Sequence, residues 1–211
     1  MSTVVIEPHF LPCIEYFCAL LPHHQLMLEK HEHFVKQSYR SRCHINTSQG
    51  SLMLVLPTAE NHGKVTLGAV QLDASPRWRN NHWRTIQSAY QKAPFFEFYG
   101  DELRTILFEP HRLLFDFNKS LLSFCLRSLK LNIPITETVS YQKGYPIEVT
   151  DLRNAINAKK HHSRRNFYHP IPYPQVFGSA FVANSSVIDL LFCEGPNATR
   201  IIKTSGLLLN K

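Results

Sequence analysis

Residues 4–28 read VVIEPHFLPCIEYFCALLPHHQLML, a pattern that indicates a strand, a helix and a second strand. The β-branched run at 4–6 predicts the first strand. Apolar residues then recur at three- and four-residue spacing between Pro12 and Pro22, which predicts a helix that begins near the first proline and ends at the second. The short apolar run at 25–28 predicts a buried strand. The first third of the chain is therefore expected to be a strand-rich α/β region.

The rest of the chain contains both kinds of element. Apolar runs predict further strands, and apolar residues at helical spacing predict helices bounded by serine caps, prolines and glycines. The strands are expected at 51–56, 65–72 and 135–141, and the helices at 75–94, at 94–108 with a break at Gly100, at 111–131, and after Ser186 as far as Gly195, with a short helical turn from Pro196. We thus predict a single α/β domain over residues 1–211. It has a small mixed sheet in its N-terminal part and a mostly helical second half.

The composition favours a folded protein with an anionic partner. Of the 211 residues, 44% are hydrophobic and 18% are charged, which provides enough apolar side chains for one good core. The formal net charge is +7 when the 12 histidines are neutral. A positive balance of this kind favours nucleotides, phosphate, coenzyme A, RNA or acidic sugars as partners.

Two features of the sequence predict a cytoplasmic protein that does not interact with a membrane. No run approaches the roughly twenty apolar residues that cross a bilayer. The N-terminus also lacks the basic region of a signal peptide and is interrupted by Glu7 and Glu15. The 5 cysteines are odd in number and scattered, which fits reduced thiols better than a disulfide framework.

Glu7 and His9 are candidates for general acid–base catalysis. They follow the first predicted strand and flank Pro8, at a strand end where α/β proteins commonly place their sites. A glutamate beside basic groups would be stabilised as an anion, and a histidine could move protons near neutral pH. The alternative is a structural turn that is held by hydrogen bonds from Glu7.

The stretch HEHFVKQSYRSRCH, residues 31–44, contains three histidines, one carboxylate and three permanent cations. On a strand, the side chains of Lys36, Arg40 and Arg42 share one face. On a helix, Lys36 and Arg40 lie one turn apart. Either structure therefore brings cations together. Guanidinium and ammonium groups bind phosphate or carboxylate, and this predicts an anion site to which His33 contributes. The alternative is a surface stripe, or salt bridges to Glu29 or Glu32.

The predicted helix at 75–94 supplies further candidates for substrate binding. His82, Arg84 and Ser88 are expected to lie away from its apolar face, and the last two are one helical turn apart. Arg84 and Ser88 could reach one ligand together, whereas His82 could also be a surface residue. Aromatic residues interleaved with polar and basic ones occur only in FYHPIPY at 167–173, so nucleic acid is the less favoured partner.

The sequence predicts no metal site and identifies no cofactor. The histidines at 31, 33, 161 and 162 lack an HExxH motif, a CxxC pair or any other independent ligand spacing. His161-His162 resembles the start of an HHxxxD acyltransferase motif, but the required aspartate is missing. Buried, unreactive thiols are favoured over a catalytic cysteine at 13 or 43. The proline-rich, basic segment 159–175 is expected to be a long irregular loop that orders over an acidic ligand.

Several stretches resemble the WbqC-like protein family. IEPHFLPCIEYF resembles that family's QPxYLPWLGYF opening, and HEHFVKQSYRSRC resembles its ENYxKQTYRNRC stretch. RNNHWRTIQSAYQKAPFFEFYGDEL is similar to its WxxxHWRSIxSAYxxSPFFEYYxDEL block, and LFDFN and SSVIDLLFCEGP are similar to further landmarks. The resemblance runs from about residue 4 to residue 202. The chain departs from the family pattern at Glu7, where glutamine is usual, at Phe10 (tyrosine), at Cys13 (tryptophan) and at Ser41 (asparagine).

The resemblance implies a bacterial protein related to those encoded with O-antigen and other surface-polysaccharide genes. It also implies transfer of an aminoacyl or acyl group to a sugar. Together with the residues, it predicts a cytoplasmic transferase of surface-glycan or related small-molecule biosynthesis that recognises an anionic donor through Lys36, Arg40 and Arg42. The alternative is a non-catalytic protein that binds an acidic ligand or RNA through the same residues.

Overall fold

A parallel sheet forms the base of the structure, which is a computed structural model that describes residues 2–59 and 64–207. Its strands are β1 (Thr3–Ile6), β2 (Gln25–Leu28), β5 (Ile135–Glu137) and β6 (Val149–Asp151), in the order β5-β2-β1-β6. All neighbours pair in parallel. Parallel neighbours need a crossover, which α1 (Ile14–Leu20) supplies between β1 and β2. β5 and β6 join the sheet from the second half of the chain.

A separate antiparallel hairpin is formed by β3 (Arg42–Thr47) and β4 (Gly50–Val55). Cys43, Ile45 and Leu54 on one of its faces are buried in the core. Because successive side chains of a strand point to opposite faces, Arg42 and His44 lie on the other face.

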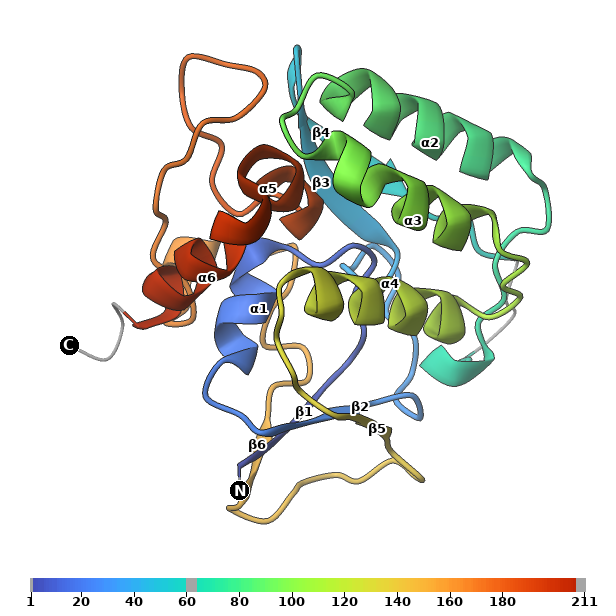
Figure 1. The fold of residues 1–211 in the computed structure, drawn as a ribbon. Coiled ribbons are helices and arrows are strands. Elements are labelled where there is room, and N and C mark those ends of the chain that lie inside the picture. Colours follow the sequence, from blue (N-terminus) through green and yellow to red (C-terminus); the bar gives the residue numbers. More distant parts are fainter. Residues whose placement is uncertain (1, 60–63, 208–211) are drawn as a thin grey trace.

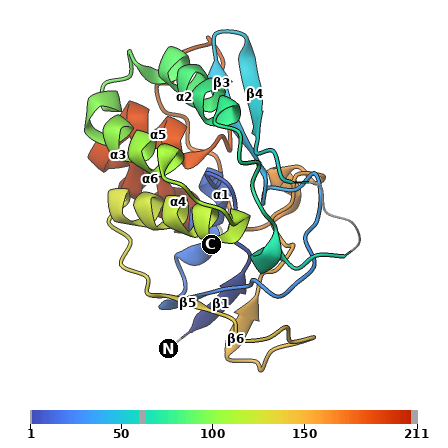
Figure 2. The same cartoon turned by 90° about the vertical axis from the view of Figure 1, so that its right-hand side faces the viewer.

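The helices pack above the parallel sheet, with α1 and α4 nearest to it (Figure 1; Figure 2). Beyond α1 they are α2 (Arg77–Tyr90), α3 (Phe96–Phe108), α4 (Leu114–Ser128), α5 (Val187–Glu194) and α6 (Ala198–Leu207). Short 3₁₀ helices lie in the connections: η1 (Leu67–Ala69), η2 (His162–Arg164) and η3 (Gly195–Asn197). Of the helices in the described residues, none is long and apolar enough to cross a bilayer.

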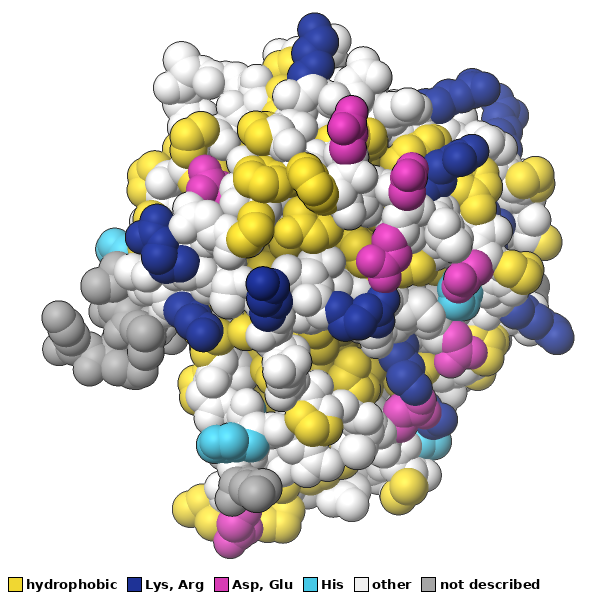
Figure 3. Space-filling view, in the orientation of Figure 1, with side chains coloured by type: hydrophobic (Ala, Val, Ile, Leu, Met, Phe, Trp, Pro, Cys, Tyr) yellow, Lys and Arg dark blue, Asp and Glu magenta, His cyan; other side chains and the backbone are white. Residues whose placement is uncertain are grey.

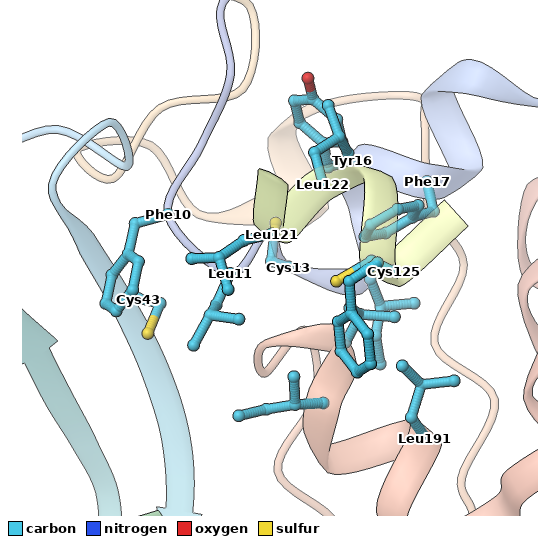
Figure 4. Close-up of a cluster of buried hydrophobic side chains, with 14 of the residues drawn as sticks. Phe10, Leu11, Cys13, Tyr16, Phe17, Cys43, Leu121, Leu122, Cys125 and Leu191 are labelled. Carbon is cyan, nitrogen blue, oxygen red and sulfur yellow. The ribbon is translucent and has the colours of Figure 1, made fainter. Parts of the chain in front are cut away.

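One hydrophobic core joins the helices to the hairpin and the sheet. Figure 4 shows a part of it, in which side chains from α1, α4, α5, β3 and the segment after β1 come together. Phe10 and Leu11 of that segment are fully buried, and burial of such a side chain stabilises the fold by about 1.5–3 kcal/mol. Because the core fixes Phe10 and Leu11, it also restrains Glu7 and His9 just before them.

The structure confirms the predicted α/β class. The strand expected at 65–72 is wrong, because residues 67–69 form the 3₁₀ helix η1, in which Leu67 is buried and the N–H of Gly68 donates to the carbonyl of Lys30 at 2.7 Å. The break expected at Gly100 is also wrong, since α3 continues through it. One glycine costs a helix only about 1 kcal/mol, which packing of the helix can offset. The sequence analysis did not predict β3 or β6.

Candidate functional site

The carboxyl ends of β1 and β6 lie next to each other, at the place in the sheet where the chain segments that follow the strands turn to opposite sides. The chain leaves β1 toward β2 on one side, while β6 pairs with the other side of β1. In open α/β sheets the crevice at such a point is the usual place for a ligand. Glu7 and His9 follow β1 here, and Asn154 follows β6. The N–H of Asn154 donates to Glu7 Oε2 at 3.0 Å, so Glu7 joins the two strand ends.

Glu7 and Glu32 share the guanidinium group of Arg40 inside the protein. Arg40 Nη2 lies 3.2 Å from Glu7 Oε1, and Arg40 Nε donates to Glu32 Oε1 at 3.0 Å. Nη2 also donates to Glu32 Oε1 and, at 2.9 Å, to Asn154 Oδ1. The exposed fractions of Glu7, Glu32 and Arg40 are 1%, 6% and 2%. One buried cation therefore faces two buried carboxyl groups.

These two carboxyl groups ionise differently. Burial raises the pKa of Glu7, but the hydrogen bond with His9 and the charge of Arg40 outweigh it, so the pKa lies below its usual value. Burial raises the pKa of Glu32 above its usual value; Arg40 opposes this effect and Glu7 adds to it. Glu7 is therefore the stable anion of the cluster, and Glu32 is the group that retains a proton more readily.

His9 contacts Glu7 through one ring nitrogen only. Its Nε2 lies 3.3 Å from Glu7 Oε1, whereas its buried Nδ1 has no hydrogen-bond partner among the described residues. The ring packs against Tyr16 and Tyr39, with centroids 4.8 and 5.5 Å away. Burial lowers the pKa of His9, and the hydrogen bond with Glu7 opposes that fall. With Nε2 donating to Glu7, Nδ1 of the neutral imidazole is an acceptor that can take up a proton.

Another buried carboxylate, Glu15 of α1, anchors two distant segments. Arg165 Nε and Nη2 donate to its two oxygens, each at 2.6 Å. Asn184 Nδ2 donates to Glu15 Oε2 at 3.1 Å, and the N–H of Glu15 donates to Asn184 Oδ1 at 2.9 Å. Arg165 Nη1 also donates to the carbonyl of Lys160 at 2.6 Å. Glu15 thereby fixes both the segment that ends at Arg165 and the turn at Asn184 to α1.

A pocket of about 180 Å³ lies between these two segments and the hairpin. One part of its wall is Tyr39, whose ring also packs against His9. Its other polar lining residues are His44, Ser51, Lys160, His161, His162, Asn184 and Ser185. Burial lowers the pKa of His44 and of His162, so both imidazoles are neutral at pH 7. The pocket therefore combines the ammonium group of Lys160 with hydroxyl, amide and imidazole groups.

Of the candidates from the first 44 residues, the structure brings together Glu7, His9 and Arg40. Lys36 and His33 are exposed on the segment before β3. Arg40 forms a salt bridge to Glu32, which was the alternative to an anion site. Arg42 is half-buried at the start of β3 and forms no ion pair within residues 2–59 and 64–207, and its buried Nε has no hydrogen-bond partner there.

The three candidates of α2 lie elsewhere. His82 was expected away from the apolar face, and this is wrong: it is 8% exposed, on the buried face of the helix, and its Nδ1 bonds to the carbonyl of Trp78 at 2.7 Å. Arg84 and Ser88 line a different depression, of about 330 Å³, beside the tip of the hairpin. They belong neither to the cluster around Glu7 nor to the 180 Å³ pocket.

The described part of the chain holds no group of three or more His, Cys, Asp or Glu side chains placed to bind a metal ion. All 5 cysteines are buried and unpaired. Burial raises the pKa of Cys13 to about 12, so this thiol stays protonated and is a poor nucleophile.

Sequence analysis missed five residues that shape the site: Glu15, Tyr39, Asn154, Arg165 and Asn184. Asn154 and Asn184 adopt positive φ values of 58° and 56°, which asparagine tolerates better than most residues. No other feature of the sequence distinguishes these two positions. The signal for Arg165 was its place in the basic segment 159–175. That segment is irregular apart from η2, and Arg165 and Tyr173 anchor it to Glu15 and Asp189. Its ordering over an acidic ligand stays a prediction.

Comparison with known proteins gives one match. The model of the WbqC-like protein family matches residues 7–166, a range that begins at Glu7 and ends just after Arg165. No match was found among curated proteins or among solved structures.

Proposed function

The chain belongs to the WbqC-like protein family, and from its buried site we propose that it is a cytoplasmic transferase of surface-glycan or related small-molecule biosynthesis. It moves an acyl or aminoacyl group from an anionic donor to an acceptor. The observation that carries this proposal is the buried Glu7–His9 pair at the diverging end of the sheet, with Nε2 and Oε1 3.3 Å apart. Such a pair is suited to proton transfer.

In this proposal His9 is the general base. Its Nδ1 takes the proton from a hydroxyl or amine of the acceptor while that oxygen or nitrogen bonds to the carbonyl carbon of the donor. The bond from this carbon to the leaving group then breaks, the leaving group takes the electron pair, and His9 returns the proton to it. Because Tyr39 lies between His9 and the pocket, its side chain rotates to admit the reacting groups.

Glu7 is a positioning residue for His9. Its carboxylate orients the ring through Nε2 and stabilises the imidazolium that forms when Nδ1 takes the proton. The N–H of Asn154 and the guanidinium group of Arg40 hold that carboxylate in turn. A glutamine at position 7 keeps an acceptor for the N–H of Asn154 but loses the charge.

The test uses two anionic donors, acetyl-coenzyme A and an aminoacyl-tRNA, with water in place of the acceptor, and measures release of the acyl or aminoacyl group. His9→Gln should lower kcat by about 100- to 10,000-fold, the usual contribution of a general base, with donor binding unchanged. His24→Gln is the matched control, because His24 is exposed. Full turnover in His9→Gln would remove His9 as the base.

The pH dependence of Glu7→Gln tests the role of Glu7. His9 must be neutral to act as a base, so the rate falls as the pH drops through its pKa. The hydrogen bond and charge of Glu7 raise that pKa against the effect of burial. Glu7→Gln should therefore keep turnover and move the acid limb of the pH–rate profile to lower pH. If the acid limb of the pH–rate profile stays at the same pH in Glu7→Gln, Glu7 has no role in the reaction.

The competing candidate is a non-catalytic protein that binds RNA or another acidic ligand. Over the right half of the face in Figure 3, Lys and Arg side chains alternate with Asp and Glu, so this part of the surface offers no basic stripe to RNA, which favours the transferase. Donor binding without turnover in the unmodified protein would favour the binding protein. An affinity for RNA that falls steeply with salt, without release of the aminoacyl group from the aminoacyl-tRNA, would do so as well.

A further inference from the structure

We infer that the 180 Å³ pocket beside Tyr39 binds a phosphate group through its lining residues Lys160 and His44, with Arg42 of β3 as a neighbouring cation. The inference deepens the proposed function, on which it rests, because it identifies the anionic part of the donor as a phosphate ester or diphosphate. Four observations support it: the hairpin face, the unpaired guanidinium group, the anchored wall and the size of the pocket.

One face of the hairpin supplies two polar side chains to the pocket. His44 and Ser51 both line it, and their side chains are linked, with Nδ1 and Oγ 3.4 Å apart. Arg42 lies two residues before His44 on β3, so its side chain is on the same face. Arg42 does not itself line the pocket, and burial together with the charge of Arg42 lowers the pKa of His44.

Arg42 is a half-buried guanidinium group without a carboxylate partner in residues 2–59 and 64–207. Arg40 is held by Glu7 and Glu32, Arg153 by Glu29 and Asp151, and Arg165 by Glu15. Arg42 has no such carboxylate within residues 2–59 and 64–207, and its buried Nε has no hydrogen-bond acceptor there. A buried donor without an acceptor costs free energy, which a bound anion would recover.

The wall opposite the hairpin is fixed, so its donors are held in place before a ligand binds. Arg165 binds Glu15 through two hydrogen bonds of 2.6 Å and holds the carbonyl of Lys160 at 2.6 Å. Lys160, His161 and His162 line the pocket from this anchored segment. Because Arg165 neutralises Glu15, that carboxylate does not oppose an anion in the pocket.

Size and geometry favour a phosphate group. A volume of about 180 Å³ is below the roughly 300–1,000 Å³ of sites that enclose a whole small ligand, so the pocket fits one charged group of a larger donor. Its polar groups come from three segments: β3 and β4, residues 160–162, and residues 184–185. A tetrahedral phosphate presents oxygens in several directions and can meet all three, whereas a planar carboxylate has only two oxygens.

Inorganic pyrophosphate is the probe, and its binding is measured by isothermal titration calorimetry with acetate as the carboxylate comparison. Arg42→Ala should weaken pyrophosphate binding by about 10- to 100-fold, the loss expected for a charge-assisted hydrogen bond. Lys160→Ala should also weaken it. Lys159→Ala is the matched control for Lys160→Ala, because it removes the same charge from an exposed neighbour that does not line the pocket.

The outcomes separate this inference from the proposed function. Equal pyrophosphate affinity in Arg42→Ala, Lys160→Ala and Lys159→Ala would overturn the pocket as the phosphate site. Failure to bind pyrophosphate in the millimolar range, together with binding of acetate, would overturn phosphate as the ligand. Neither result touches the effect of His9→Gln on turnover, which tests the transferase itself. Circular dichroism of Arg42→Ala checks that the variant is folded.

Discussion

Replacement of Arg40 by alanine should destabilise the protein strongly. The change removes the one guanidinium group between Glu7 and Glu32, which are 1% and 6% exposed. Removal of one partner from a buried ion pair typically costs about 3–5 kcal/mol, because the remaining charge is left in a medium that solvates it poorly. At about 2–4 °C per kcal/mol for a protein of this size, Tm should fall by about 6–20 °C.

The assay is equilibrium unfolding in urea, followed by circular dichroism, with Tm measured in parallel. Arg42→Ala is the matched control. Arg42 is half-buried and forms no ion pair in the described residues, so its loss should change the free energy of unfolding by less than about 1 kcal/mol. The double variant Arg40→Ala, Glu32→Ala removes one of the orphaned carboxyl groups and should recover part of the loss.

The reasoning is refuted if Arg40→Ala loses no more stability than Arg42→Ala. That result would mean that water or a shared proton already compensates Glu7 and Glu32 inside the protein. If the double variant is as unstable as Arg40→Ala, the whole loss in the free energy of unfolding comes from the unpaired Glu7.

Two further predictions concern protons and backbone strain. As the pH falls below about 6.5, the unfolded chain binds protons at His9, His44 and His82 that the native state resists, because burial lowers the pKa of each in the fold; Tm should therefore decline over that range, and a constant Tm would contradict the assigned burial. Gly195→Ala should lower the free energy of unfolding by more than about 1 kcal/mol, because φ is +52° and the new Cβ would lie 2.5 Å from Cδ1 of Phe95. Gly144→Ala, with no atom within 4 Å of the new Cβ, is the control and should change it little.

The fold could be predicted from the sequence where local patterns are strong. β1, α1 and β2 lie within three residues of their predicted bounds, because apolar periodicity and two prolines mark them. β3 was missed because its sequence, RCHINT, is mostly polar even though Cys43 and Ile45 enter the core. β6 has only three residues, too few to show a period. Its strand conformation comes from pairing with β1.

The site was predictable only where it depends on a strand end. Glu7 and His9 were identified because they follow a clear strand. The sequence shows that Arg40 and Arg42 are cations, but it does not show which of them meets a carboxylate, since that depends on the path of residues 31–44. The contacts of Glu15 with Arg165 and Asn184 span 150 and 169 residues, and no local pattern encodes such pairs.

The hydrogen bond between Glu7 and the N–H of Asn154 also determines how late in protein synthesis the candidate site can be completed. The two residues are 147 positions apart. At about 5–20 residues per second, a ribosome takes about 7–30 s to travel from one to the other. During that interval β1 has no β6 to pair with, and the crevice at the end of the sheet is incomplete. The candidate site is therefore incomplete on the ribosome until the chain has been made at least as far as Asn154.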